Sequence, residues 1–125
     1  MNMIKERRTT NNNESRSVCK NWIGVPILDT NNRLCEGEKK LPNGTVVRFV
    51  NGLIDGNIYD SDGNSIMQRP AVEYKYGGQE FWTKGCPDGY PAVSQNMGYY
   101  EEDWTNGHIV KIREEQILED IEFFG

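Results

Sequence analysis

The chain has 125 residues and a formal net charge of −5, which together predict a single acidic domain with one modest core. The acids are concentrated at the C-terminal end, where residues 96–125 hold eight Asp or Glu against two Lys or Arg. This balance argues against nucleic acid as a direct ligand, because phosphate contacts need basic side chains.

The first 17 residues are rich in Asn, Thr, Ser and Arg and show no apolar periodicity. Residues 1–17 are therefore predicted to be a flexible tail, either disordered or ordered by a partner, and residues 18–125 a single β-rich domain. The sequence contains no apolar run long enough to cross a bilayer and no secretory signal. We therefore expect no membrane contact and a cytoplasmic location in a bacterial or phage-infected cell.

The first structured segments are predicted to be extended. Residues 22–28 are expected to be a strand or extended segment, with Pro26 favouring the edge of a sheet. Residues 45–50 are rich in β-branched side chains and lie between Asn43-Gly44 and Asn51-Gly52. Asn-Gly pairs strongly favour tight hairpin turns, so residues 45–50 are predicted to be a strand.

Two later segments alternate along the chain with a period of two, which is typical of strands with one buried face. The side chains predicted to share a face are Val72, Tyr74 and Tyr76 in the first segment and Tyr100, Glu102 and Trp104 in the second. Residues 108–112 are predicted to add a further short strand.

The pattern changes after residue 112. Ile117, Leu118 and Ile121 have the spacing i, i+1, i+4, with Glu and Asp elsewhere in the segment, which predicts a short amphipathic helix over residues 113–123. A helix this short is stable only when it packs against other elements, so we expect it to lie on the sheet.

The middle of the chain repeats a motif of about twenty residues. One copy runs from Pro70-Ala71-Val72 to Trp82-Thr83-Lys84-Gly85, and the next runs from Pro91-Ala92-Val93 to Trp104-Thr105-Asn106-Gly107. A weaker copy ends at Phe49-Val50-Asn51-Gly52. Copies this small must pack side by side to bury their apolar faces. The predicted fold is therefore mainly β, an antiparallel β-meander of tandem hairpins in which Trp82 and Trp104 occupy equivalent environments.

These motifs, which cover roughly residues 41–111, resemble MORN-type repeats. They are closer still to the tandem "G-P-A … W … N-G" repeats of bacterial and phage proteins. The resemblance implies stacked hairpins that contact proteins or lipids rather than perform catalysis. An acidic net charge opposes binding to anionic lipid surfaces, so a protein partner is the expectation.

Two sets of residues are of the types that commonly bind metal ions in proteins. Cys19, Cys35, Cys86 and His108 could form a structural zinc site, although no two of them have the short spacing of zinc-binding pairs. Residues 55–64 are rich in side-chain oxygens but do not match the order of Gly and Glu in an EF-hand loop, so an Asx-type hairpin turn is preferred. We predict reduced, unreactive cysteines, no metal, no cofactor and no catalytic residue, with zinc as the alternative.

The candidate functional residues are acidic and aromatic. A cluster of carboxylates could bind Lys and Arg of a partner, and Tyr and Trp are common at the centre of protein interfaces. A solvated strand face and ordinary core packing explain the same residues without any function. The residues predicted to contact a partner are Glu80, Trp82, Tyr99, Glu101, Glu102, Asp103 and Trp104.

These observations predict a non-enzymatic protein-binding module that occludes a basic surface of its partner. In size and style the chain is similar to phage-encoded inhibitors of bacterial defence systems. The alternative is a carbohydrate- or small-ligand-binding β-module that uses Trp82 and Trp104 as repeated sites, and a cysteine or metal-assisted enzyme is the least favoured. An edge strand of the meander could also pair with a second copy to form a homodimer.

Overall fold

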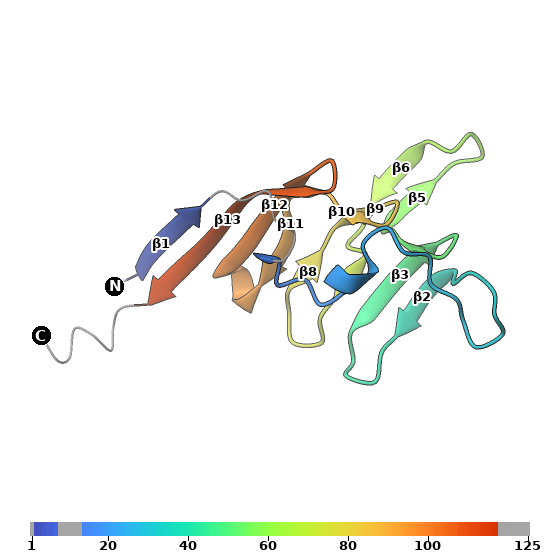
Figure 1. Ribbon diagram of the computed structural model, residues 1–125, viewed down its shortest axis with the longest axis horizontal. Coiled ribbons are helices and arrows are strands. Elements are labelled where there is room, and N and C mark those ends of the chain that lie inside the picture. The colour runs from blue at the N-terminus through green and yellow to red at the C-terminus, as the bar shows by residue number, and fades with distance from the viewer. Residues whose placement is uncertain (1, 8–13, 118–125) are drawn as a thin grey trace, which may run out of the picture.

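The computed structural model describes the backbone of residues 2–7 and 14–117 and the side chains of residues 14–115. Antiparallel strands dominate this part of the chain, which confirms the prediction of a mainly β fold (Figure 1). Nine strands form one long sheet, and two short hairpins form separate two-stranded sheets. The described residues include two complete three-residue 3-10 turns, η2 (Lys20–Trp22) and η3 (Asn96–Gly98).

The large sheet joins strands from both ends of the chain. In spatial order it contains β1 (Asn2–Arg7), β13 (His108–Ile117), β12 (Tyr100–Thr105), β11 (Gly89–Gln95), β8 (Gln79–Glu80), β7 (Val72–Glu73), β3 (Val46–Val50) and β2 (Gly37–Lys40), with β4 (Leu53–Ile54) paired to β3 outside this order. The small sheets pair β5 (Asn57–Tyr59) with β6 (Ser65–Gln68) and β9 (Trp82–Thr83) with β10 (Cys86–Pro87). Consecutive strands β11, β12 and β13 are neighbours, as in a meander, whereas β1 returns to pair with β13.

Three tight turns repeat one backbone geometry. Asn51-Gly52, Lys84-Gly85 and Asn106-Gly107 have positive φ at both residues, with values between 50° and 85°. Positive φ at both central residues is the signature of the type I′ turn, whose twist matches that of paired strands. The three turns join β3 to β4, β9 to β10 and β12 to β13. The repeat found in the sequence is therefore a repeat of hairpin geometry.

An aromatic side chain two residues before each turn belongs to the core. Phe49, Trp82 and Trp104 are 5%, 0% and 0% exposed, respectively. Phe49 and Trp82 belong to one buried cluster and Trp104 to a second, and Ile23 packs against both. The two indoles thus occupy equivalent positions in successive hairpins, as the sequence repeat predicts.

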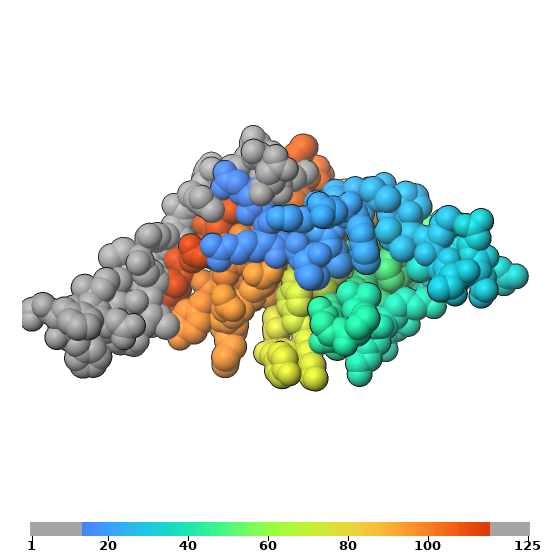
Figure 2. Space-filling view, turned by 60° about the horizontal axis from the view of Figure 1, so that its bottom comes forward, coloured from blue at the N-terminus to red at the C-terminus, as the bar shows by residue number. Residues whose placement is uncertain are grey.

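A segment of residues 14–19, which we name the strap, crosses one face of the large sheet (Figure 2). Ser15, Ser17 and Cys19 are buried, whereas the residues between them are exposed, so alternate side chains point towards the sheet. Residues 1–17 were expected to be a tail, yet this region contributes both β1 and most of the strap. Buried hydroxyl residues give no apolar periodicity, which is why the sequence pattern did not reveal the strap.

The predicted C-terminal helix over residues 113–123 is wrong for the residues that the structure describes. Residues 113–117 continue strand β13, which pairs with β12 on one side and with β1 on the other. Residues 118–123 lie outside the described part of the chain. Residues 22–28 were predicted to be a strand or an extended segment. They contain the end of η2, a turn and one isolated bridge, between Leu28 and Leu34, but no strand.

Candidate functional site

Two buried glutamates form matching side-chain centres under the strap. Glu80 on β8 and Glu102 on β12 are both 0% exposed. Among the described side chains, no Lys or Arg lies within ion-pair distance of either one. A buried charge without a cation must be satisfied by hydrogen bonds, and each of these carboxylates accepts four.

At Glu80, each carboxylate oxygen accepts two hydrogen bonds. Oε1 accepts from the hydroxyl of Ser17 at 2.6 Å and from the indole N–H of Trp82 at 2.8 Å. Oε2 accepts from the backbone N–H of Val18 at 3.2 Å and from the hydroxyl of Tyr74. The strap therefore supplies two of the four donors.

Glu102 repeats this arrangement one hairpin later. Oε1 accepts from the hydroxyl of Ser15 at 2.8 Å and from the indole N–H of Trp104 at 2.8 Å. Oε2 accepts from the backbone N–H of Arg16 at 2.6 Å and from the hydroxyl of Tyr100 at 2.6 Å. Both centres thus combine a strap serine, the next strap amide, an indole and a phenol.

The two phenols reach their carboxylates from different places in the repeat. Tyr100 lies two residues before Glu102, but the corresponding position before Glu80 is Gly78. A Cβ at Gly78 would lie 2.8 Å from Cδ2 of Tyr74, so the Tyr74 ring occupies the space that a side chain at residue 78 would need. The copy that contains Glu80 therefore receives the same kind of donor from Tyr74, which follows β7, the strand paired with β8.

The chemistry of these centres is structural rather than nucleophilic. Burial raises the pKa of Glu80, although donated hydrogen bonds, first among them that of Ser17, oppose the shift. Burial, reinforced by the charge of Glu80, raises the pKa of Tyr74 and raises the pKa of Cys19 to about 12. The phenol and the thiol therefore stay protonated near neutral pH, and neither is an activated nucleophile.

The residues predicted to contact a partner divide between the two faces of the sheet. Those without exposed surface are Glu80, Trp82, Glu102 and Trp104. Tyr99 is 39% exposed, and the side chains of Glu101 and Asp103 are 28% and 9% exposed. Alternation along β12 separates Glu102 from its two acidic neighbours, so the predicted residues do not form one continuous surface.

Arg113 on β13 neutralises the two acids on the opposite face. Its Nη2 donates to Asp103 at 2.7 Å and to Glu101 at 3.2 Å, and its Nη1 donates to the second oxygen of Asp103. Hydrogen bonding to Asp103 raises the pKa of Arg113, so the guanidinium remains charged. Arg48 forms a similar set of ion pairs with Glu38 and Glu73. Because the negative charges of these carboxylates are paired with Arg113 or Arg48, they are weak candidates for attracting a basic partner.

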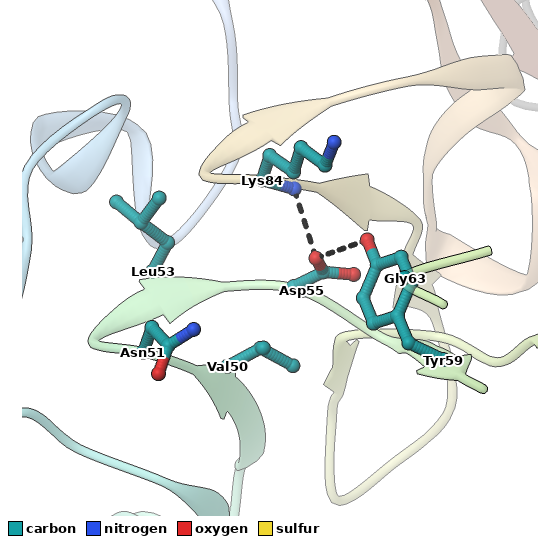
Figure 3. Close-up of a pocket in the computed structure, with 7 residues that line it drawn as sticks. All are labelled: Val50, Asn51, Leu53, Asp55, Tyr59, Gly63 and Lys84. Carbon is teal, nitrogen blue, oxygen red and sulfur yellow. Dashed lines mark hydrogen bonds between the residues drawn. The ribbon is translucent and has the colours of Figure 1, made fainter. Parts of the chain in front are cut away.

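An open pocket of about 460 Å³ lies beside the turn at Lys84 (Figure 3). In that view, Leu53, Asn51 and Val50 lie on one side of it, with Lys84, Asp55 and Tyr59 on the other; Gly63 completes the lining. The pocket therefore combines an apolar wall with polar groups.

The carboxylate in this pocket is also fully hydrogen-bonded. Asp55 Oδ2 accepts from the hydroxyl of Tyr59 at 2.6 Å and from the backbone N–H of Lys84 at 3.1 Å. Its Oδ1 accepts from the backbone and side-chain nitrogens of Asn57. Burial and the hydrogen bond to Asp55 raise the pKa of Tyr59 to about 12, so this phenol is neutral at physiological pH. The pocket suits a bound side chain better than a proton-transfer reaction.

The hairpin formed by β5 and β6 projects from the long sheet (Figure 1). All four residues of β6 are exposed, with Ile66 at 65% and Met67 at 56%. At the tip, Asp60 Oδ1 accepts from the backbone N–H groups of Asp62 and Asn64, both at 2.9 Å, which confirms the predicted Asx-type turn. Sequence reasoning missed this surface because two adjacent apolar residues among polar ones have no periodicity.

The four candidate zinc ligands do not gather at one point. The described residues contain no group of three or more His, Cys, Asp or Glu side chains that could hold a metal ion. Cys19 and Cys35 are buried in the same apolar cluster, whereas Cys86 is partly buried and His108 is exposed. Burial raises the pKa of the Cys86 thiol, so this cysteine is protonated as well.

Comparison with protein-family models, curated proteins and solved structures finds no match to this chain. In the part of the chain that the structure describes, no helix is long and apolar enough to cross a membrane. The candidate surfaces are therefore interpreted from their own geometry and chemistry.

Proposed function

We propose that the chain is a non-enzymatic protein-binding module that contacts a basic surface of its partner through the β5–β6 hairpin. The observation that carries this proposal is the exposure of Ile66 and Met67 beside the acidic tip formed by Asp60 and Asp62. Single exposed apolar residues are ordinary on protein surfaces. Here two large apolar side chains are exposed on one projecting hairpin, at a place where a register shift interrupts the strict alternation of faces, and this favours an interface.

The charge of the tip favours a basic partner. Neither Asp60 nor Asp62 forms an ion pair with a described side chain, in contrast to Glu101 and Asp103, which are held by Arg113. The net charge of −5 adds a long-range attraction that increases the rate of encounter with a positively charged surface. Such binding is expected to weaken as salt concentration rises.

The pocket beside the hairpin offers a second point of contact. Tyr59 and Gly63 belong to the hairpin region, and they line the pocket together with Val50 and Leu53. An apolar side chain, or the methylene groups of a Lys or Arg from the partner, could be buried there. The module would then act by covering the partner's surface, and inhibition of a bacterial defence protein is one use of such a module.

The carbohydrate-binding alternative has weaker support. Trp82 and Trp104 are both 0% exposed, and their indole N–H groups donate to Glu80 and Glu102. A sugar ring stacks on an accessible aromatic face, which neither indole offers in this arrangement.

Affinity capture with paired variants tests the proposed function. The variant Ile66→Ser/Met67→Ser is expected to lose the captured partner, whereas Tyr76→Ser/Met97→Ser is expected to keep it. The control pair also removes two exposed large side chains, with 87% and 89% exposure, but from loops outside the hairpin. Asp60→Asn/Asp62→Asn should reduce the salt dependence of binding. Equal capture by wild type and the hairpin variant would refute the proposal.

A further inference from the structure

We infer that the face under the strap is a recognition site for an extended Ser-x-Ser segment, and that the strap of a second copy of this chain can fill it. The site consists of the two matching centres at Glu80 and Glu102. Each centre accepts hydrogen bonds from one serine hydroxyl and from the backbone N–H of the following residue. Because the serines are two residues apart, one extended segment satisfies both centres at once.

The contacts depend on the local strap sequence and not on its connection to the rest of the chain. Ser15 and Ser17 lie 87 and 63 residues from the glutamates that they contact. The four bonds involve residues 15–18 only. A segment of the same sequence from another chain would therefore make the same four bonds.

The residue between the serines adds direction and specificity. The guanidinium carbon of Arg16 lies 4.3 Å from the centroid of the Tyr100 ring, and Nη1 lies 2.8 Å from a carboxylate oxygen of Glu114. The side-chain amide of Gln95 donates to the backbone oxygen of Arg16 at 2.6 Å. The site thus favours a basic residue between two hydroxyl residues, with the chain running in one direction.

A site without a strap would be unfavourable. A chain that has released its own strap is therefore expected to bind the strap of a second copy. If the strap leaves, each buried glutamate loses two of its four donors and is left partly unsatisfied. A second copy that has also released its strap can place that strap on the first copy, and its own empty site can bind the strap of the first copy. Reciprocal exchange restores every bond in both copies, and its main cost is the entropy of association.

A thiol-specific cross-link distinguishes a strap bound in its own chain from one bound in a second copy. One chain carries Arg16→Cys and the other carries Glu114→Cys, at positions whose side chains are 48% and 39% exposed, and both carry Cys86→Ser. The full-length chains are mixed at high concentration in sub-denaturing urea, returned to buffer and treated with a short bismaleimide. The reagent supplies a spacer, because Arg16 and Glu114 meet only at the tips of long side chains and a direct disulfide needs closer Cβ atoms. We expect a cross-linked heterodimer, identified by intact-mass spectrometry.

Three matched samples complete the experiment. A single chain carrying both cysteines should form an internal cross-link, which shows that the variants fold with the strap in place. Replacing Arg16→Cys by Ser61→Cys, an exposed position at the tip of the β5–β6 hairpin, sets the background of random cross-linking. Adding Ser15→Ala and Ser17→Ala to the Arg16→Cys chain should lower the heterodimer yield at least about tenfold.

The inference is overturned if the internal cross-link forms but the mixed chains give no heterodimer above the Ser61→Cys background. It is also overturned if the two Ser→Ala substitutions leave the yield unchanged, because the serine hydroxyls would then not be what the site recognises. Neither result depends on whether the β5–β6 hairpin binds a protein partner.

Discussion

At the level of single residues, the two strap centres show how a small β protein accommodates a buried carboxylate without a cation. Glu80 and Glu102 each accept hydrogen bonds from one indole, one phenol, one serine and one backbone amide. All four donors are neutral, so each bond is assisted by only one charge. Removing any one of them leaves the carboxylate partly unsatisfied, and this makes the centres sensitive to mutation.

The pH dependence of stability follows from the raised pKa of Glu80. Its ordinary value is 4.5, and in the folded chain the carboxyl keeps its proton to higher pH. The stabilisation that this gives is complete below the unfolded-state pKa and is lost as pH rises through the folded-state pKa. We therefore expect the unfolding free energy of wild type minus that of Glu80→Gln to decrease as pH rises from the ordinary value of 4.5 into the neutral range.

Urea denaturation of both proteins across that range measures the difference, and other titrating groups largely cancel because both chains contain them. A difference that grows with pH would show that the four donors favour the ionised carboxylate more strongly than burial opposes it.

Lys84 is a residue-scale exception within the repeated turns. It has φ of 50° at the position that Asn51 and Asn106 occupy in the other two turns. Asn adopts positive φ more readily than Lys, so Lys84→Asn is expected to stabilise the fold by about 0.5–1 kcal/mol. The hydrogen bond to Asp55 is retained, because the donor is the backbone N–H. The reverse change, Asn106→Lys, should destabilise by a similar amount, and equal midpoints of thermal unfolding would contradict the turn argument.

At the level of elements, the two serines of the strap each donate a hydrogen bond to a buried glutamate. Ser15→Ala or Ser17→Ala removes a hydrogen bond to a buried carboxylate, so each is expected to lower the unfolding free energy by about 1.5–3 kcal/mol. Ser61→Ala, at the exposed tip of the β5–β6 hairpin, should change it by less than about 0.5 kcal/mol. Chemical denaturation compares the three variants, and a loss no larger than that of Ser61→Ala would mean that the strap contributes little to stability.

The β5–β6 hairpin depends on a close backbone approach at its base. A Cβ at Gly56 would lie 2.0 Å from the carbonyl oxygen of Arg69 and 2.8 Å from the backbone nitrogen of Ala71. Backbone atoms cannot move aside as a flexible side chain can, so Gly56→Ala is expected to cost about 3 kcal/mol or more. Gly63→Ala is the control within the same hairpin, because it meets no atom within 4 Å and carries only the strain of its φ of +83°.

The control should cost about 1 kcal/mol. Thermal unfolding followed by circular dichroism separates the two variants, and similar losses would show that the base of the hairpin yields easily.

At the level of the whole molecule, the sequence predicted the features that depend on neighbouring residues. The Gly-containing turns and the alternation of Tyr100, Glu102 and Trp104 are local patterns, and each corresponds to a hairpin turn or a buried strand face. The Asx turn at Asp60 was predictable for the same reason. A mainly β fold follows directly from such patterns.

The features that escaped prediction depend on residues far apart in the sequence. Glu is normally exposed, so nothing local indicates that Glu80 and Glu102 are buried or that Ser15 and Ser17 cover them. Residues 113–117, the second half of β13, were predicted to be helical because their partner β1 lies at the other end of the chain. For the same reason, the sequence did not reveal that the candidate partner-binding residues lie on two different faces of the sheet.

The pairing of β1 with β13 has a consequence for biosynthesis. Asn2 is in register with Ile117, so β1 has no partner until the last described strand has been made. The strap cannot form its hydrogen bonds until residues 80 and 102, which carry the acceptors, have been made. Assembly during translation must therefore begin in the central hairpins and finish with the N-terminal segments, and such non-local closure slows folding. β1 and the strap are synthesised before the strands that they contact, so they remain within reach of chaperones and proteases until those strands are made.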